Sequence, residues 1–260
     1  MMIKGTLLIA AVVATVSLVP PPAHALLEFA GDAGGVLVCA TDNNVPCVFG
    51  TQIPDTNPAP NVLALGSTAT PILIDGLSVM GSVSTAIFGA VNILDSSSLA
   101  IANVAGAPVT GHFTVSATGF VPPVNTSFLS GSGTWVTADG STMTLTWFND
   151  PQNAQGAETS LDRPGTLLGT FTDIATGPAD SFSSTNTVAV SDLAPFSMTL
   201  GFDLTLTPGG SLISRGQTEI KPVSTAVPEP STLMLVGLGL GLVSLLARRR
   251  QPRARQALDQ

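Results

Sequence analysis

Side chains that can do chemistry are few and scattered in this chain of 260 residues. His112 is the one histidine beyond the first 25 residues, and a histidine beside a carboxylate and a serine is the pattern of a nucleophilic hydrolase. No Gly-x-Ser-x-Gly segment supplies that serine. Glu28, Glu158 and Glu219 are too dispersed to indicate the carboxylate pair of a glycosidase. We therefore expect His112 to be a structural residue at a strand edge, no catalytic residues, and a protein that is not an enzyme.

The chain contains two cysteines, Cys39 and Cys47. The seven residues between them include Asn43, Asn44 and Pro46 and can turn back on themselves. In an exported protein, two such cysteines usually pair in the oxidising compartment. We predict a Cys39–Cys47 disulfide. A zinc site would need more ligands than these residues and His112 offer, so no metal and no cofactor is expected.

Two further features have a structural and a functional interpretation. The acidic turns Asp42-Asn43-Asn44 and Asp139-Gly140 carry oxygen atoms of the kind that bind calcium. The ligand spacing of a calcium loop is missing, which favours plain surface turns. Trp135 and Trp147 lie twelve residues apart on alternating segments. Burial in the core is the favoured interpretation, and an aromatic platform for sugars is the alternative.

Composition narrows the class of protein further. Charged residues make up only 10% of the chain, against roughly 25% in an average soluble protein. Between residues 26 and 227 there are 15 acidic and three basic residues, so this stretch carries a net charge of 3 − 15 = −12. A strongly acidic domain does not attract a phosphate backbone, which excludes nucleic acid as a partner.

Alternation of apolar and polar residues recurs along the middle of the chain and predicts β-strands. The clearest strands are predicted at 112–118, 133–137, 143–147 and 198–206, and weaker ones at 36–40, 71–74, 77–83, 86–94, 99–104, 165–171, 188–190 and 212–214. Turn sequences such as Asp75-Gly76 and Pro208-Gly209-Gly210 separate them. We predict an all-β antiparallel β-sandwich over 26–220, jelly-roll-like or immunoglobulin-like, with a closed barrel as the alternative. The first 45 residues of this domain are the least regular and are predicted to form a loop-rich edge.

The N-terminal 25 residues have the order of a secretory signal peptide. Lys4 precedes an apolar run from Leu7 to Val19, which is followed by three prolines and by Ala23-His24-Ala25. The signal peptidase requires small side chains at positions such as Ala23 and Ala25. We predict that the secretion machinery exports the chain and that residues 1–25 are removed.

The C-terminal region has the features of a weak membrane anchor. Residues 221–227 are predicted to be a linker, and Pro228 and Pro230 keep the following stretch extended. The 14 residues from Leu233 to Leu246 carry no charge and would form a transmembrane helix of about 21 Å, which is short for a hydrocarbon layer of about 30 Å. Gly237 and Gly241 lie on one face of that helix and allow another helix to approach closely.

Arginines follow the apolar segment directly. Arg248, Arg249 and Arg250 act as a stop-transfer signal, because a basic cluster holds its end of a membrane helix in the cytoplasm. Residues 252–260 form a basic cytoplasmic tail in this prediction. The domain would then lie outside the inner membrane, with the C-terminus inside.

Val227, Pro228, Glu229 and Pro230, the apolar segment and the arginines together resemble the PEP-CTERM sorting signal, here over 228–251. That signal is typical of Gram-negative bacteria that make an envelope and exopolysaccharide. The resemblance implies recognition and cleavage near Pro-Glu-Pro by an exosortase, an integral-membrane cysteine transpeptidase. The same kind of tail is also labelled an ice-binding protein C-terminal domain, which implies nothing about ice for the rest of the chain.

These observations lead to one expected function and two alternatives. We expect an exported cell-surface or extracellular-matrix protein that is anchored in the inner membrane by its C-terminal helix before processing and then contributes to envelope or exopolysaccharide. The first alternative is a surface module that binds carbohydrate or calcium. The second is an exported hydrolase, which would need a cleft where His112 meets a carboxylate and a hydroxyl.

Overall fold

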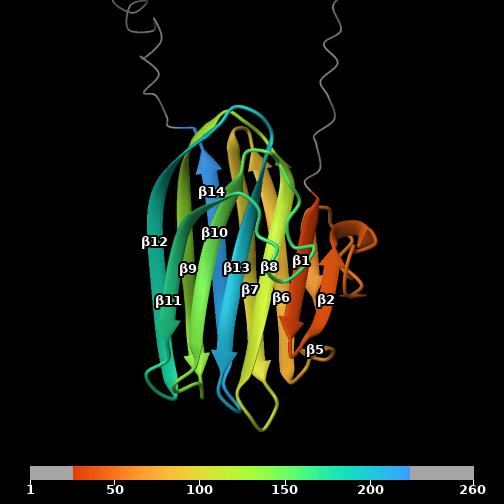
Figure 1. Ribbon diagram of the computed structural model, residues 1–260, viewed down its shortest axis with the longest axis vertical. Coiled ribbons are helices and arrows are strands. Elements are labelled where there is room, and N and C mark those ends of the chain that lie inside the picture. Colours follow the sequence, from red (N-terminus) through yellow and green to blue (C-terminus); the bar gives the residue numbers. More distant parts are fainter. Residues whose placement is uncertain (1–25, 223–260) are drawn as a thin grey trace, which may run out of the picture. The chain divides into compact units, whose positions relative to one another are not determined.

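Long strands with alternately buried side chains make up most of the computed structural model, which describes residues 26–222. In β13 (Phe196–Leu206), for example, Phe196, Met198, Leu200, Phe202 and Leu204 are all buried. These apolar residues share one face of β13 because the side-chain period of a strand is two. The opposite face is also buried from Ser197 to Gly201. The strands assemble into two sheets packed face to face (Figure 1).

Each sheet contains seven strands. Sheet A has the order β11 (Thr166–Ile174), β10 (Thr142–Asp150), β13, β8 (Val109–Phe120), β1 (Leu27–Ala33), β2 (Val36–Thr41) and β3 (Thr51–Gln52). Sheet B has the order β12 (Ala179–Asp192), β9 (Val124–Val136), β14 (Ser211–Lys221), β7 (Val91–Asn103), β6 (Leu77–Phe88) and β4 (Val62–Leu65), with β5 (Ile72–Ile74) also paired to β6. The prediction of an all-β sandwich is confirmed.

The connectivity identifies the kind of sandwich. Antiparallel pairs nest inside one another along the chain, β7 with β14, β8 with β13, β9 with β12, and β10 with β11. Four of these strands lie side by side in each sheet, β12-β9-β14-β7 and β11-β10-β13-β8. This is the connectivity of a jelly roll, a sandwich of two four-stranded sheets. The jelly-roll form of the prediction therefore describes the fold, and the immunoglobulin-like form and the barrel do not.

The structure corrects two of the local predictions. The predicted loop-rich edge is present at 42–61, around the edge strand β3 of sheet A, but residues 27–33 form β1, which lies inside the sheet between β8 and β2. Its residues are buried on both faces, apart from the half-buried Asp32, although polar Glu28 and Asp32 alternate with apolar residues in the sequence. The predicted strand 86–94 contains a hairpin turn between β6 and β7, where Gly89 adopts a φ of +63°.

Lys221 is the last residue of β14, and Pro222 is the last residue that the structure describes. The predicted signal peptide, the rest of the linker, the sorting motif, the helix and the arginines lie outside the described residues. Within residues 26–222, the chain forms no helix of the length and hydrophobicity that crossing a membrane requires.

The predicted disulfide is present. Cys39, at the buried end of β2, is bonded to Cys47 beyond the short 3₁₀ turn η1 (Asp42–Asn44). The bond ties this loop to sheet A, which β3 joins by pairing with Val38 and Cys39.

This bond gives a prediction for the exported protein. Thiol labelling under denaturing, non-reducing conditions is expected to find no free cysteine. Replacing both cysteines with serine is expected to lower the free energy of unfolding by about 2–3 kcal/mol, because the crosslink limits the entropy of the unfolded chain. Two labelled thiols per chain would contradict the assignment.

Candidate functional site

His112 and its partners lie on the outer face of sheet A. The Nδ1 atom of His112, on β8, is 2.8 Å from Oδ1 of Asp203, which is its direct neighbour on β13. Arg163 donates two hydrogen bonds of 2.7 Å to the two oxygens of the same carboxylate. Burial alone would raise the pKa of Asp203, but hydrogen bonds and charge from Arg163 and His112 outweigh burial and hold the pKa below its ordinary value.

Arg163 belongs to the loop 151–165, between β10 and β11, and fastens this loop to the sheet. Its Nε donates to Oγ1 of Thr114, and Thr114 in turn donates to the carbonyl of Ser160 in the loop. The backbone nitrogen of Gly156 donates to Oγ of Ser116. The loop therefore covers part of the outer face of sheet A and buries the hydroxyls of β8.

The carboxylate beside His112 has hydrogen-bond partners on both of its oxygens. Asp203 is engaged by both His112 and Arg163, and within residues 26–222 no serine or threonine hydroxyl is hydrogen-bonded to His112. In the described part of the chain, the hydrogen-bond partner of His112 is therefore a carboxylate. Through Arg163, the cluster of His112, Asp203 and Arg163 fastens the loop 151–165 to sheet A, and we call this cluster the loop latch.

Glu28 of β1 lies beneath the same covered surface. Glu28 is only 4% exposed. Burial and, to a smaller extent, the negative charges of Glu158 and Asp162 in the loop raise the pKa of Glu28 from 4.5 to about 7. Near neutral pH this carboxyl group is therefore divided between its protonated and charged forms.

This shift predicts a pH dependence of stability. The folded state binds a proton at Glu28 more tightly than the unfolded state, so the contribution of Glu28 to stability falls as pH rises from about 4.5 to about 7. The side chain of the variant Glu28→Gln is neutral at every pH. The free energy of unfolding of this variant is expected to decrease less than that of the wild-type protein as pH rises from about 4.5 to about 7. Urea midpoints at pH 5 and pH 8 measure the difference, and equal losses in the two proteins would contradict the prediction.

Both tryptophans are core residues. Trp135 is fully buried and donates from Nε1 to Oδ2 of Asp173, 2.7 Å away. Trp147 is 2% exposed and donates to the carbonyl of Gln217. The prediction of core packing is confirmed, and the alternative of a surface platform is wrong because neither ring reaches solvent.

The acidic turns have structural roles. Oδ2 of Asp42 accepts a hydrogen bond from the backbone of Asn61, and Oδ1 of Asn44 accepts one from the backbone of Asp55. Gly140 adopts a φ of +77° in the connection from β9 to β10. Residues 26–222 contain no group of three or more histidine, cysteine or acidic side chains placed to hold a metal ion.

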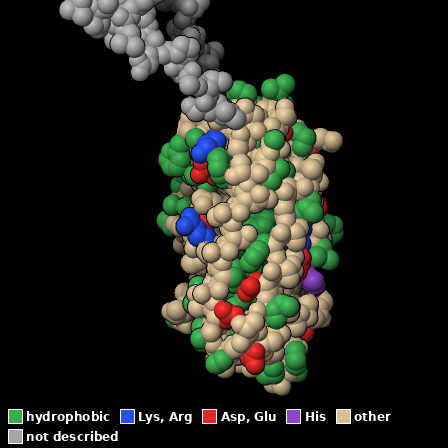
Figure 2. Space-filling model, turned by 90° about the vertical axis from the view of Figure 1, so that its left-hand side faces the viewer, with side chains coloured by type: hydrophobic (Ala, Val, Ile, Leu, Met, Phe, Trp, Pro, Cys, Tyr) green, Lys and Arg blue, Asp and Glu red, His purple; other side chains and the backbone are tan. Residues whose placement is uncertain are grey.

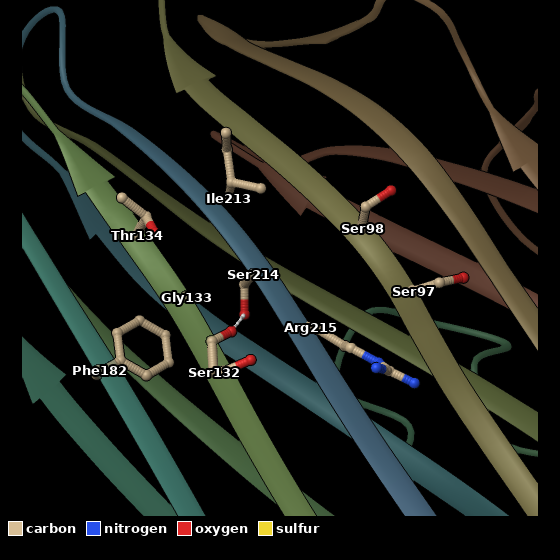
Figure 3. A pocket seen from close by; sticks show the side chains of 9 residues that line it. All are labelled: Ser97, Ser98, Ser132, Gly133, Thr134, Phe182, Ile213, Ser214 and Arg215. Carbon is tan, nitrogen blue, oxygen red and sulfur yellow. Dashed lines mark hydrogen bonds between the residues drawn. The ribbon is translucent and has the colours of Figure 1, made fainter.

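A groove that the sequence analysis did not predict lies on the outer face of sheet B. It has a volume of about 250 Å³ and crosses β7, β14, β9 and β12 (Figure 3). The residues that line it are Ser97, Ser98, Ser132, Gly133, Thr134, Phe182, Ile213, Ser214 and Arg215.

A β-bulge places two of these hydroxyls. Ser97 and Ser98 lie opposite the single residue Arg215, and both serines are exposed. Gly81 of β6 makes room for this bulge with a φ of +148°, and a Cβ atom there would lie only 2.1 Å from the carbonyl oxygen of Ser98. Arg215 pairs with Asp95 of β7 through hydrogen bonds of 3.0 and 2.8 Å.

The other side of the groove forms around Gly133. Because this residue has no side chain, the ring of Phe182 approaches the β9 backbone, and a Cβ atom at position 133 would lie 2.4 Å from Cζ of Phe182. Phe182 also packs against Trp135 and Phe171, with ring centroids 6.1 and 5.5 Å apart. The ring therefore packs with the core, on the same side of sheet B as Gly133 and Trp135.

A second hollow lies further along β9. It has a volume of about 440 Å³ and is lined by Phe128, Leu129, Ser130, Thr185, Asn186 and Thr187. The ammonium group of Lys221 lies 4.3 Å from the centre of the Phe128 ring.

Figure 2 views the molecule from its left-hand side in Figure 1, where polar uncharged side chains and backbone dominate and charged side chains are sparse.

Comparison with known proteins bears on the C-terminal region. Residues 226–251 match the model of the PEP-CTERM protein-sorting motif. The chain carries a PEP-CTERM motif. Such a motif implies export, processing by an exosortase and sorting to the cell surface. The stretch predicted from the sequence as a sorting signal, 228–251, lies within this match. Curated proteins gave no significant match.

Solved structures resemble the sandwich only distantly. A structure of TmCBM61 with β-1,4-galactotriose is 9% identical, covers 54% of this chain and 86% of its own, and has a TM-score of 0.31. The C-terminal CBM6 of LamC, a laminarinase from Zobellia galactanivorans, is 12% identical, with coverages of 61% and 99% and a TM-score of 0.24. At such scores the likeness carries no argument about a ligand.

Proposed function

We propose that the protein is a non-enzymatic component of the cell surface or extracellular matrix that is linked to envelope or exopolysaccharide. The secretion machinery exports it, the C-terminal helix anchors it in the inner membrane, and an exosortase then processes it. The β-sandwich is the part that remains at the surface.

One observation carries this proposal, the PEP-CTERM motif at residues 226–251. The jelly-roll domain supports it in two ways. Its Cys39–Cys47 disulfide suits an oxidising compartment outside the cytoplasm. The carboxylate next to His112 is bound by Arg163 in a loop latch, which gives that histidine a structural role.

Fractionation of the native bacterium tests the proposal. The protein is expected in the surface or extracellular fraction of the wild-type strain and in the inner membrane of a strain that lacks the exosortase. Catalysis is tested separately by His112→Gln, which keeps a hydrogen-bonding side chain. Failure to reach the surface in the wild-type strain would contradict the proposal, as would a hydrolytic activity that His112→Gln abolishes.

A further inference from the structure

The two outer faces of the sandwich differ in access. On sheet A, the loop 151–165 covers Thr114 and Ser116, which are fully buried. On sheet B, the side chains of Ser132 and Thr134 point outward from β9 and are exposed, as are Ser97 and Ser98 of β7. These four hydroxyl groups of sheet B are therefore accessible to an external partner, whereas the hydroxyls of Thr114 and Ser116 beneath the loop are not.

We propose that the outer face of sheet B binds a neutral polysaccharide chain, which lies along β9 over both hollows. This inference rests on the proposed function and gives the exported domain a means of attachment to exopolysaccharide. The groove around Ser132 and Arg215 is the central contact.

Arg215 is arranged as a preorganised hydrogen-bond donor. Its Nε and one terminal nitrogen are fixed by the carboxylate of Asp95. The other terminal nitrogen, Nη1, has no hydrogen bond to any residue between 26 and 222. The Arg215 side chain is 51% exposed, so its free N–H groups face solvent. A fixed planar donor loses little entropy when it binds neighbouring sugar hydroxyls.

The remaining lining suits the two kinds of surface that a sugar ring presents. Hydroxyls of Ser97, Ser98 and Ser132 can both donate and accept hydrogen bonds. The exposed side chain of Ile213 offers an apolar contact for the C–H face of a ring, and Phe128 offers another in the second hollow.

Charge selects a neutral polymer over an acidic one. Arg215 and Asp95 cancel each other in the groove. The sandwich around them is strongly acidic, with three basic and 15 acidic residues between 26 and 227. A polyanion would be repelled by this field, whereas a neutral chain pays no such cost.

The spacing of the hollows selects a chain over a single sugar. Ser130, in the second hollow, and Thr134, in the first, are four residues apart on β9, which corresponds to about 13 Å along a strand. An extended ligand can occupy both hollows at once.

Affinity electrophoresis of the mature protein purified from its host tests the inference. The gels contain the exopolysaccharide of the producing strain, neutral dextran, or anionic alginate. Ser132→Trp fills the groove from an exposed position, and Thr170→Trp is its matched control on an exposed position of β11 in sheet A. We expect retardation by a neutral polymer, at least about tenfold weaker binding for Ser132→Trp, and no change for Thr170→Trp.

Three results would overturn the inference. In the first, the wild-type protein is retarded in neither the exopolysaccharide gel nor the dextran gel. In the second, it is retarded in the alginate gel alone. In the third, the two tryptophan variants bind equally well. Equal urea midpoints for both variants establish that folding is unaffected. Surface fractionation of Ser132→Trp separates this inference from the proposed function, because a variant that reaches the surface without binding polysaccharide shows that sorting is independent of the groove.

Discussion

Replacing Pro228, Glu229 and Pro230 with alanine is expected to leave the full-length protein in the inner membrane and to abolish the processed form. The three residues lie within the match to the PEP-CTERM motif. The prolines keep this stretch extended, as a processing enzyme requires, whereas alanines extend the predicted helix that follows. Western blots of membrane and surface fractions measure the result.

A matched control lies a few residues upstream of the motif. Alanines at Pro222, Ser224 and Thr225 change the same number of positions in the predicted linker, and processing is expected to proceed normally. Replacing Arg248, Arg249 and Arg250 with alanine is expected to let part of the protein pass through the membrane, because the stop-transfer charge is lost. Normal processing of the Pro-Glu-Pro variant would contradict the role assigned to the motif.

Arg163→Ala is expected to be the most destabilising of the charge substitutions in the sandwich. The Arg163 side chain is only 10% exposed. Its loss leaves the Asp203 carboxylate without two hydrogen bonds of 2.7 Å and releases the loop 151–165 from Thr114. We expect a decrease in the free energy of unfolding of about 2–4 kcal/mol, measured by urea denaturation.

Arg215→Ala provides the comparison for Arg163→Ala. Arg215 also pairs with one aspartate through two hydrogen bonds, but its side chain is 51% exposed and water can replace much of the interaction. We expect a loss of about 1 kcal/mol or less. Equal losses in the two variants would show that the loop latch contributes nothing beyond an exposed ion pair.

Local patterns in the sequence predicted much of the sandwich. Alternation located β8, β10 and β13, because each has one buried and one solvated or covered face. The short spacing of Cys39 and Cys47 predicted their disulfide. Trp135 and Trp147 were predicted to be core residues from their place in alternating strands, and both are buried.

The contacts that local patterns did not predict join distant parts of the chain. Arg215 and Asp95 are 120 residues apart, and Arg163 and Asp203 are 40 apart. Strand pairing brings each set together, and the sequence contains no local signal for the register of strands so far apart. β1 was missed for a related reason, since its place inside sheet A depends on pairing with β8, which lies far away along the chain.

The intact mass of the protein recovered from the cell surface tests the central claim most directly. The 260 residues of the sequence have a mass of 26.3 kDa. We predict a smaller protein that begins at Leu26, ends near Pro228 to Pro230 and retains the Cys39–Cys47 disulfide, apart from the mass of any group added by the exosortase. A surface protein that retains all residues from Met1 to Gln260 would contradict export and sorting through the two ends.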